Sequence, residues 1–206
     1  RCNGMFAFAA WDTHQEQLYL VRDRLGIKPL YYAWTGSLLL FASELKAIRC
    51  FPGFTPEIDR TALSLFLQHN YVPAPYSIYQ DVRKLPAASS LRINADVAGD
   101  RPSPTTYWSF PDKVREAQSN RFGGTDDEAV DALEAKLGRA VAMRMRADVP
   151  LGAFLSGGID STAVVSLMQF RSDRKVKTFC IGFDESAFDE STHARAVADH
   201  LQTDHT

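Results

Sequence analysis

The feature that most restricts the fold of this chain is a change in its apolar pattern near residue 120. Before that point, short apolar runs at residues 5–11, 17–22, 29–34 and 37–42 alternate with turn sequences, which is typical of an antiparallel sheet. After it, strand-like runs alternate with helix-like segments, a pattern that favours parallel strands joined by helices. We therefore predict an α+β domain followed by an α/β domain with a doubly wound parallel sheet.

The first domain is predicted to contain further elements, and composition places its end. Helices are expected at residues 43–48 and 59–69, and strand segments at residues 77–85 and 90–94. Residues 95–125 are rich in Pro, Gly, Ser and Asp, which is typical of a connection between domains. The predicted domains are therefore residues 1–110 and 126–206, with a linker at residues 111–125.

The second domain begins with a strong helix signal. Thr125 and Glu128 form a capping-box pattern, and the helix is expected to reach about Arg146. One apolar stripe is predicted along it, formed by Val130, Leu133, Leu137, Val141 and Met145. Strands are predicted at residues 150–155 and 175–183, helices at residues 161–170 and 190–201, and a polar, helix-like segment at residues 204–206.

Composition excludes several classes of protein. The net charge of −2 argues against a strongly basic nucleic-acid-binding protein, because such binding depends on Lys and Arg neutralising phosphates. No apolar run approaches the roughly 20 residues of a membrane helix. The three cysteines, Cys2, Cys50 and Cys180, are widely spaced and form neither a zinc pattern nor a disulfide framework, so a reducing cytoplasm is the expected compartment.

The most informative segment joins the predicted strand at residues 150–155 to the helix that follows. It reads Leu155, Ser156, Gly157, Gly158, Ile159, Asp160 and Ser161. Two glycines without Cβ atoms let backbone amides close around an anion at a helix start, where the helix dipole favours negative charge. A carboxylate suits such a cradle when it helps to hold Mg²⁺ on a phosphate, which is the role predicted for Asp160. The alternative is a tight turn in which Asp160 only stabilises the helix start.

The segment lacks the Lys of the Walker phosphate loop and the glycine spacing of the dinucleotide fingerprint. Its letters S-G-G-I-D-S resemble the PP-loop of the ATP pyrophosphatases, enzymes that split ATP between the α and β phosphates. R-D-R-L-G-I-K-P-L-Y-Y at residues 22–32 is similar to the glutaminase domain of glutamine-hydrolysing asparagine synthetases. Further segments similar to that family lie at residues 4–12, 41–47, 84–86, 149–152, 178–183 and 189–190.

This resemblance implies a fold and an activity. The fold would be part of an N-terminal-nucleophile (glutaminase type 2) domain, followed by part of a PP-loop ATP pyrophosphatase domain. The activity would be asparagine formation from aspartate, ATP and glutamine through an acyl-adenylate, with release of AMP and pyrophosphate. Leu155 and Ile181 would flank the nucleoside, the turn would hold pyrophosphate, and Asp160 would assist Mg²⁺. The expected cofactors are ATP and Mg²⁺, and the expected assembly is a homodimer without nucleic-acid or membrane partners.

The resemblance also implies what this chain lacks. Arg1 stands in place of an initiator Met, so we expect a central fragment of a longer protein that is inactive alone. No catalytic residue is expected here, because the family's nucleophilic Cys lies upstream and Cys2 does not match it. Two groups of residues are expected to be solvent-facing rather than metal ligands: Asp184, Glu185, Asp189 and Glu190 on a loop and helix start, and His193, His200 and His205.

Two alternatives to asparagine formation stay open. One is a related enzyme with another acceptor, as in β-lactam synthetases or enzymes that amidate a sugar carboxylate. Residues 69–79 are similar to the branch of the family associated with surface-polysaccharide loci, which fits the latter. The other is a degenerate fragment without catalysis.

Overall fold

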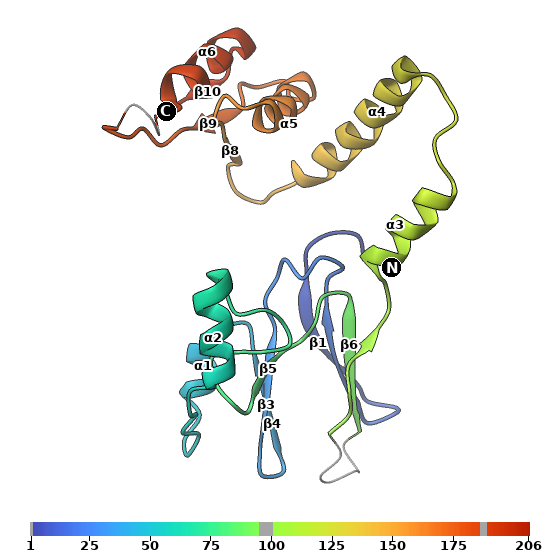
Figure 1. Cartoon of the computed structure of the whole chain (residues 1–206), viewed down its shortest axis with the longest axis vertical. Coiled ribbons are helices and arrows are strands. Elements are labelled where there is room, and N and C mark those ends of the chain that lie inside the picture. The colour runs from blue at the N-terminus through green and yellow to red at the C-terminus, as the bar shows by residue number, and fades with distance from the viewer. Residues whose placement is uncertain (1, 95–100, 186–188) are drawn as a thin grey trace. The chain divides into compact units, whose positions relative to one another are not determined.

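The structure is a computed structural model that describes residues 2–94, 101–185 and 189–206. Two compact units make up the chain, Arg1–Arg121 and Phe122–Thr206. Figure 1 shows the strands of the first unit and the alternating strands and helices of the second. The segment expected to connect the domains falls partly at residues 95–100, outside the described residues.

Two antiparallel sheets form the first unit, as its alternating pattern predicts. The first sheet has the order β1 (Ala7–Asp12), β2 (Gln17–Arg22), β6 (Ser89–Asn94) and β7 (Thr105–Thr106). The second has the order β4 (Leu38–Ala42), β3 (Tyr31–Thr35) and β5 (Val82–Lys84). The strand predicted at residues 77–85 is shorter than expected.

Buried side chains join these sheets. Leu20 and Leu91 of the first sheet form one cluster with Leu30, Tyr32 and Leu85, which lie on or beside the second. A separate cluster on the second sheet contains Ala33, Val82 and, from helix α1 (Leu45–Arg49), Ile48. The two sheets therefore share a core, and α1 packs on the second sheet.

Two buried charged residues, Arg22 and Asp23, hold the loop after β2 in place. The Arg22 guanidinium donates to the carbonyls of Gly26, Lys28 and Leu85 at 2.6, 2.8 and 2.6 Å. The Asp23 carboxylate accepts from backbone N–H groups of the same loop and from Phe6. Internal hydrogen bonds thus hold this part of the family-like R-D-R-L-G-I-K-P segment in its folded shape.

Two further helices complete the unit. Helix α2 (Arg60–His69) begins where predicted, and the Asp59 carboxylate accepts from two N–H groups of its first turn. Helix α3 (Phe110–Ser119) lies within the segment expected to connect the domains. Its start is fixed by the Ser109 hydroxyl, which accepts from the Asp112 N–H, and by a Pro in the first turn.

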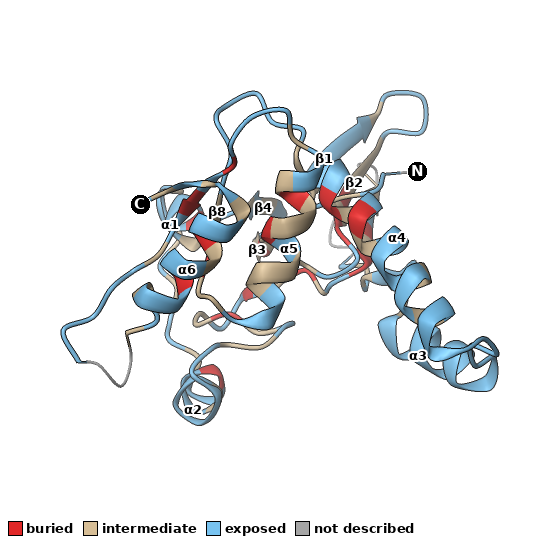
Figure 2. Ribbon diagram, turned by 90° about the horizontal axis from the view of Figure 1, so that it is seen from above, coloured by how far each residue is buried: buried red, intermediate tan, exposed pale blue. Residues whose placement is uncertain are grey.

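The second unit has a parallel sheet with the order β10 (Asp204–His205), β9 (Lys177–Phe179) and β8 (Gly152–Phe154). Its helices are α4 (Asp126–Arg144), α5 (Ile159–Phe170) and α6 (Ser191–Leu201). Leu155, Val165, Ala194 and Ala198 form a core between the sheet and the last two helices. Figure 2 shows buried residues on α5 and α6.

The prediction of a helix-like end at residues 204–206 is wrong. Asp204 and His205 pair with β9, and the Thr206 N–H donates to the Thr178 carbonyl at 2.9 Å. The buried Thr178 hydroxyl lies 3.0 Å from His205 Nδ1. Pairing with a neighbouring strand therefore overrides the local preference of a polar sequence.

The capping box of α4 is confirmed, but its apolar stripe is only partly buried. The Thr125 N–H donates to Glu128 Oε2 at 2.8 Å, and the Glu128 N–H donates to Thr125 Oγ1 at 3.3 Å. Val141 packs with Met168 and Val176, whereas Val130 and Leu133 are more than 60% exposed. Only the second half of the helix contributes to this unit's core.

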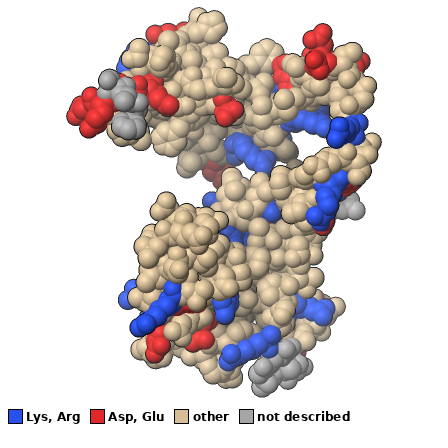
Figure 3. All heavy atoms as spheres, in the orientation of Figure 1, with Lys and Arg blue, Asp and Glu red and all other residues tan. Residues whose placement is uncertain are grey.

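Surface charge and helix length concern the two classes that composition argued against, strongly basic nucleic-acid-binding proteins and proteins with membrane helices. On the face shown in Figure 3, acidic and basic side chains occur on both units. Among the described residues, none of the helices combines the length and apolar character that crossing a bilayer requires.

Candidate functional site

The turn at residues 155–161 lies at the carboxyl edge of the parallel sheet. The Leu155 N–H donates to the Phe179 carbonyl at 2.9 Å, so the ends of β8 and β9 lie side by side. Leu155 is buried, and Ile181, two residues beyond β9, is 65% exposed. Helices α5 and α6 both follow strands that end here. In open α/β sheets, this edge is where ligands bind.

Hydroxyl groups fix the shape of the turn. Ser156 Oγ and Ser161 Oγ lie 3.0 Å apart, and the Ser161 hydroxyl donates to the Gly158 carbonyl at 3.1 Å. The Gly158 N–H donates to Ser156 Oγ at 3.3 Å. These bonds connect the end of the strand to the first turn of α5, so both hydroxyls are held beside the helix start.

The start of α5 leaves backbone donors for a ligand. The Thr162 N–H donates to the Gly158 carbonyl at 3.0 Å, which is the first bond of the helical ladder. The N–H groups of Ile159, Asp160 and Ser161 precede it and have no intrahelical acceptor. Gly158, the N-cap residue, supplies no side-chain cap. The Asp160 side chain is exposed in the first turn, where a carboxylate can meet a cation that accompanies an anion.

Gly157 is the position at which a side chain cannot be accommodated. Its φ is +78°, and a Cβ atom there would lie 2.7 Å from His193 Cβ, 2.8 Å from His193 C and 2.9 Å from Ala194 N. Two of these three atoms belong to the backbone of α6, which cannot turn aside as a side chain can. The first turn of α6 therefore packs directly on the glycine turn, a contact that the sequence pattern did not reveal.

Of the acidic residues after β9, Asp189 bonds to the start of α6. Asp189 Oδ1 accepts from the Ser191 N–H at 3.1 Å, and Asp189 Oδ2 accepts from the Ser191 hydroxyl at 3.0 Å. These donors hold the pKa of the Asp189 carboxyl below its usual range. Within the residues the structure describes, no three His, Cys, Asp or Glu side chains are placed to share a metal ion. Asp189 thus helps to begin α6.

The histidines were expected to be exposed, and two of the three are. His193 and His200 are exposed on α6, whereas His205 is half-buried beside Thr178. Its position on β10 explains the difference, because that strand was not predicted.

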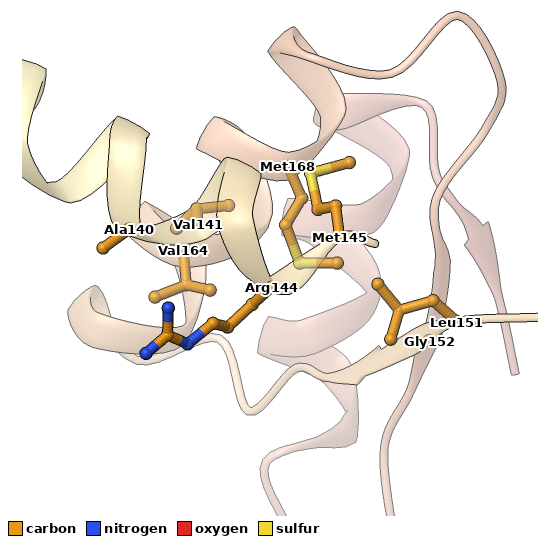
Figure 4. Close-up of a pocket in the computed structure, with 8 residues that line it drawn as sticks. All are labelled: Ala140, Val141, Arg144, Met145, Leu151, Gly152, Val164 and Met168. Atoms are coloured by element: carbon orange, nitrogen blue, oxygen red, sulfur yellow. The ribbon is translucent and has the colours of Figure 1, made fainter. Parts of the chain in front are cut away.

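An apolar cavity of about 370 Å³ lies elsewhere in the second unit. Figure 4 shows side chains of α4 and α5 lining it, with Leu151 on the strand side. Its lining residues are Ala140, Val141, Arg144, Met145, Leu151, Gly152, Val164 and Met168. Since these side chains are mostly apolar and lack the turn's hydroxyls and carboxylate, this cavity is not the candidate site.

Taken together, the turn offers helix-start N–H groups that no described residue accepts from, two hydroxyls and an exposed carboxylate at one edge of the sheet. That donor set can bind an anion, and Asp160 adds a ligand for a cation bound with it. The structure brings Ser156 to Ser161 together with the end of β9, near Ile181.

Comparisons with known proteins agree with the two halves seen in the sequence. Residues 1–108 match the family described as glutamine amidotransferase domain, and residues 132–206 match the family described as asparagine synthase. The two matches follow each other in the same order as the two units.

Relatives resemble this chain along nearly its whole length. A provisionally named glutamine-hydrolysing asparagine synthetase of Methanocaldococcus jannaschii is 37% identical over 98% of this chain and 38% of its own length. Asparagine synthetase (glutamine-hydrolysing) 1 of Bacillus subtilis is 34% identical over 96% of this chain and 29% of its own. A Gibberella zeae protein named as an amidase is 32% identical over 98% of this chain and 31% of its own. The chain thus spans between 29 and 38% of the length of these relatives. By these matches, the chain belongs to the glutamine-hydrolysing asparagine synthetase family.

Proposed function

We propose that the turn at residues 156–161 binds the phosphates of ATP in an enzyme that makes asparagine. The observation that carries this proposal is the turn's position: a glycine-containing loop at the carboxyl edge of a parallel sheet, whose helix-start N–H groups have no acceptor among the described residues. The asparagine synthase match covers this region and supports the assignment. Leu155 follows β8 and Ile181 follows β9, so both lie at this edge, where a nucleoside would extend from its phosphates.

The proposed reaction has two steps. An oxygen of the aspartate side-chain carboxylate attacks the α phosphorus of ATP, the bond between the α and β phosphates breaks, and pyrophosphate leaves. Ammonia then attacks the carbonyl carbon of the acyl-adenylate, AMP leaves with the bonding electron pair, and a proton is lost to give asparagine. Mg²⁺ would neutralise phosphate charge during the first step, and Asp160 is the residue proposed to assist it.

We propose that the first unit is part of a glutaminase domain. Its match to a glutamine amidotransferase domain supports this role, with glutamine as the source of ammonia. We propose an N-terminal-nucleophile fold for this unit and a PP-loop fold for the second, supported by their antiparallel and parallel sheets. A homodimer in the cytoplasm, without nucleic-acid or membrane partners, is proposed from the resemblance and the composition.

A second candidate is the same chemistry with another acceptor carboxylate. The relative that is named as an amidase matches this chain over nearly its full length, so similarity at this level does not fix the acceptor. The two candidates share the ATP site and differ only in the molecule that is adenylylated.

The test is pyrophosphate release from ATP by the intact protein that carries this chain. With aspartate and an ammonium salt, the wild type is expected to release pyrophosphate and form asparagine, and Asp160→Ala is expected to abolish release. Asp173→Ala, an exposed change in the loop after α5, is the matched control and should retain activity. Release that is unaffected by Asp160→Ala would refute the site. Release that depends on another carboxylic acid, with aspartate inert, would favour the second candidate.

A further inference from the structure

We propose that His193 is an additional phosphate-binding residue of this site, reaching it from α6 rather than from the turn. The proposal rests on the proposed ATP site and concerns which side chains contact its phosphates. No residue of α6 belongs to the S-G-G-I-D-S segment, so the motif alone does not assign one.

The first argument is contact. The Cβ atom that Gly157 lacks would lie 2.7 Å from His193 Cβ, which places the His193 side chain beside the glycine at the centre of the turn. The position of His193 is fixed by the residue that follows it. Ala194 is fully buried in the core shared by β8, α5 and α6, so the start of α6 is held against the glycine turn.

The second argument is direction. Both α5 and α6 follow parallel strands, so both helices begin at the carboxyl edge of the sheet. A helical side chain leans toward the N-terminus of its own helix, so the His193 side chain leans toward that edge. An anion on the N–H groups at the start of α5 would bind at this same edge.

The third argument is availability. The His193 side chain is exposed, and it has neither a hydrogen-bond nor an ion-pair partner among the residues that the structure describes. Its neighbour Ser191 is already bonded to Asp189. Neutral imidazole can donate one N–H to a phosphate oxygen, and imidazolium adds a positive charge. His193 thus combines a position beside Gly157 with a donor that has no partner among the described residues.

The test is binding of inorganic pyrophosphate, in the presence of Mg²⁺, to the intact protein that carries this chain, measured by isothermal titration calorimetry. His193→Leu replaces the ring by an apolar group of similar size and should weaken binding about tenfold, since hydrogen bonds to charged groups are among the stronger ones. His193→Lys restores a donor and should bind within a few-fold of wild type. His200→Leu, an equivalent change two turns later on the exposed side of α6, should bind like wild type.

The possible results separate this inference from the proposed function. Wild-type binding that is lost in Asp160→Ala but unchanged in His193→Leu would refute the role of His193 and leave the ATP site standing. Equal losses in His193→Leu and His200→Leu, or no recovery in His193→Lys, would also refute it, because the effect would then be structural. Absence of pyrophosphate binding by the wild type would refute both proposals.

Discussion

Gly157→Ala should loosen the second unit, although it adds a single methyl group. The backbone at Gly157 has a φ of +78°, a conformation that residues with a Cβ atom rarely adopt. The added atom would also lie within 2.9 Å of two backbone atoms of α6. Helix α6 must therefore move away from the turn, and the core that it forms with β8 and α5 must open with it.

The size of the effect follows from these two costs. Left-handed backbone at a residue with a Cβ atom costs about 1–2 kcal/mol. Overpacking in a fixed environment costs about 1–3 kcal/mol. The sum, about 2–5 kcal/mol, is a large share of the roughly 5–15 kcal/mol that stabilises a typical domain. Gly158→Ala is the matched control, because Gly158 has a φ of −72° and its added Cβ would meet only Ser156 Oγ, at 3.3 Å. We expect a change within about 1 kcal/mol for Gly158→Ala.

Hydrogen exchange measured by mass spectrometry is the suitable assay. All three tryptophans of the chain, Trp11, Trp34 and Trp108, lie in the first unit, so their fluorescence does not report on the second. Peptides from α6 should exchange roughly 30-fold faster or more in Gly157→Ala, while tryptophan fluorescence during urea unfolding stays unchanged. Equal protection of α6 in Gly157→Ala and Gly158→Ala would show that the close packing of α6 on the turn is wrong.

Two further predictions concern hydrogen bonds outside the site. Burial raises the pKa of the Asp23 carboxyl, but the N–H donors of four residues outweigh it and hold the pKa below its usual range. The carboxylate therefore stabilises the first unit above a pH of about 4, and this stability is lost as the pH falls through the lowered pKa. Asp23→Asn should cost about 1–3 kcal/mol at pH 7 and reduce the loss on acidification, as measured by tryptophan fluorescence in urea; an unchanged midpoint at pH 7 would contradict this. Thr125→Ala removes the N-cap acceptor of α4 and should cost about 1 kcal/mol, visible as faster exchange in its first turns, whereas Thr125→Ser should be nearly neutral.

The sequence predicts local features of the second unit better than its tertiary contacts. The capping box at Thr125 and the strand–turn–helix around Gly157 depend on neighbouring residues, so their patterns are readable in the chain. The two glycines at 157 and 158 look equivalent in the sequence. The structure shows that Gly157 is the one that must lack a Cβ atom, because its φ is +78° against −72° at Gly158 and because α6, more than 30 residues later, packs against it.

The same limit explains the features that the sequence did not predict. The strand at residues 204–205 forms because β9 offers unpaired backbone groups, and nothing in its polar sequence indicates this. Val130 and Leu133 belong to a regular apolar stripe, yet they stay exposed because no described part of their own unit covers the first half of α4. Helix α3 was not predicted, because its segment has a loop-like composition and the Pro at its start is equally compatible with a loop.

The two family-like segments owe their resemblance to different constraints. The side chains of Arg22 and Asp23 are both buried, and they form hydrogen bonds with backbone groups of the loop and of residues 6 and 85. This segment is therefore constrained by folding, and its match identifies the family without assigning a reacting group. At Ser156–Ser161, by contrast, the N–H groups of the helix start and the exposed Asp160 carboxylate have no hydrogen-bond partner among the described residues, and our proposal assigns them to ATP binding. A change at Asp23 should thus lower the stability of the first unit, whereas a change at Asp160 should impair the use of ATP while leaving the fold intact.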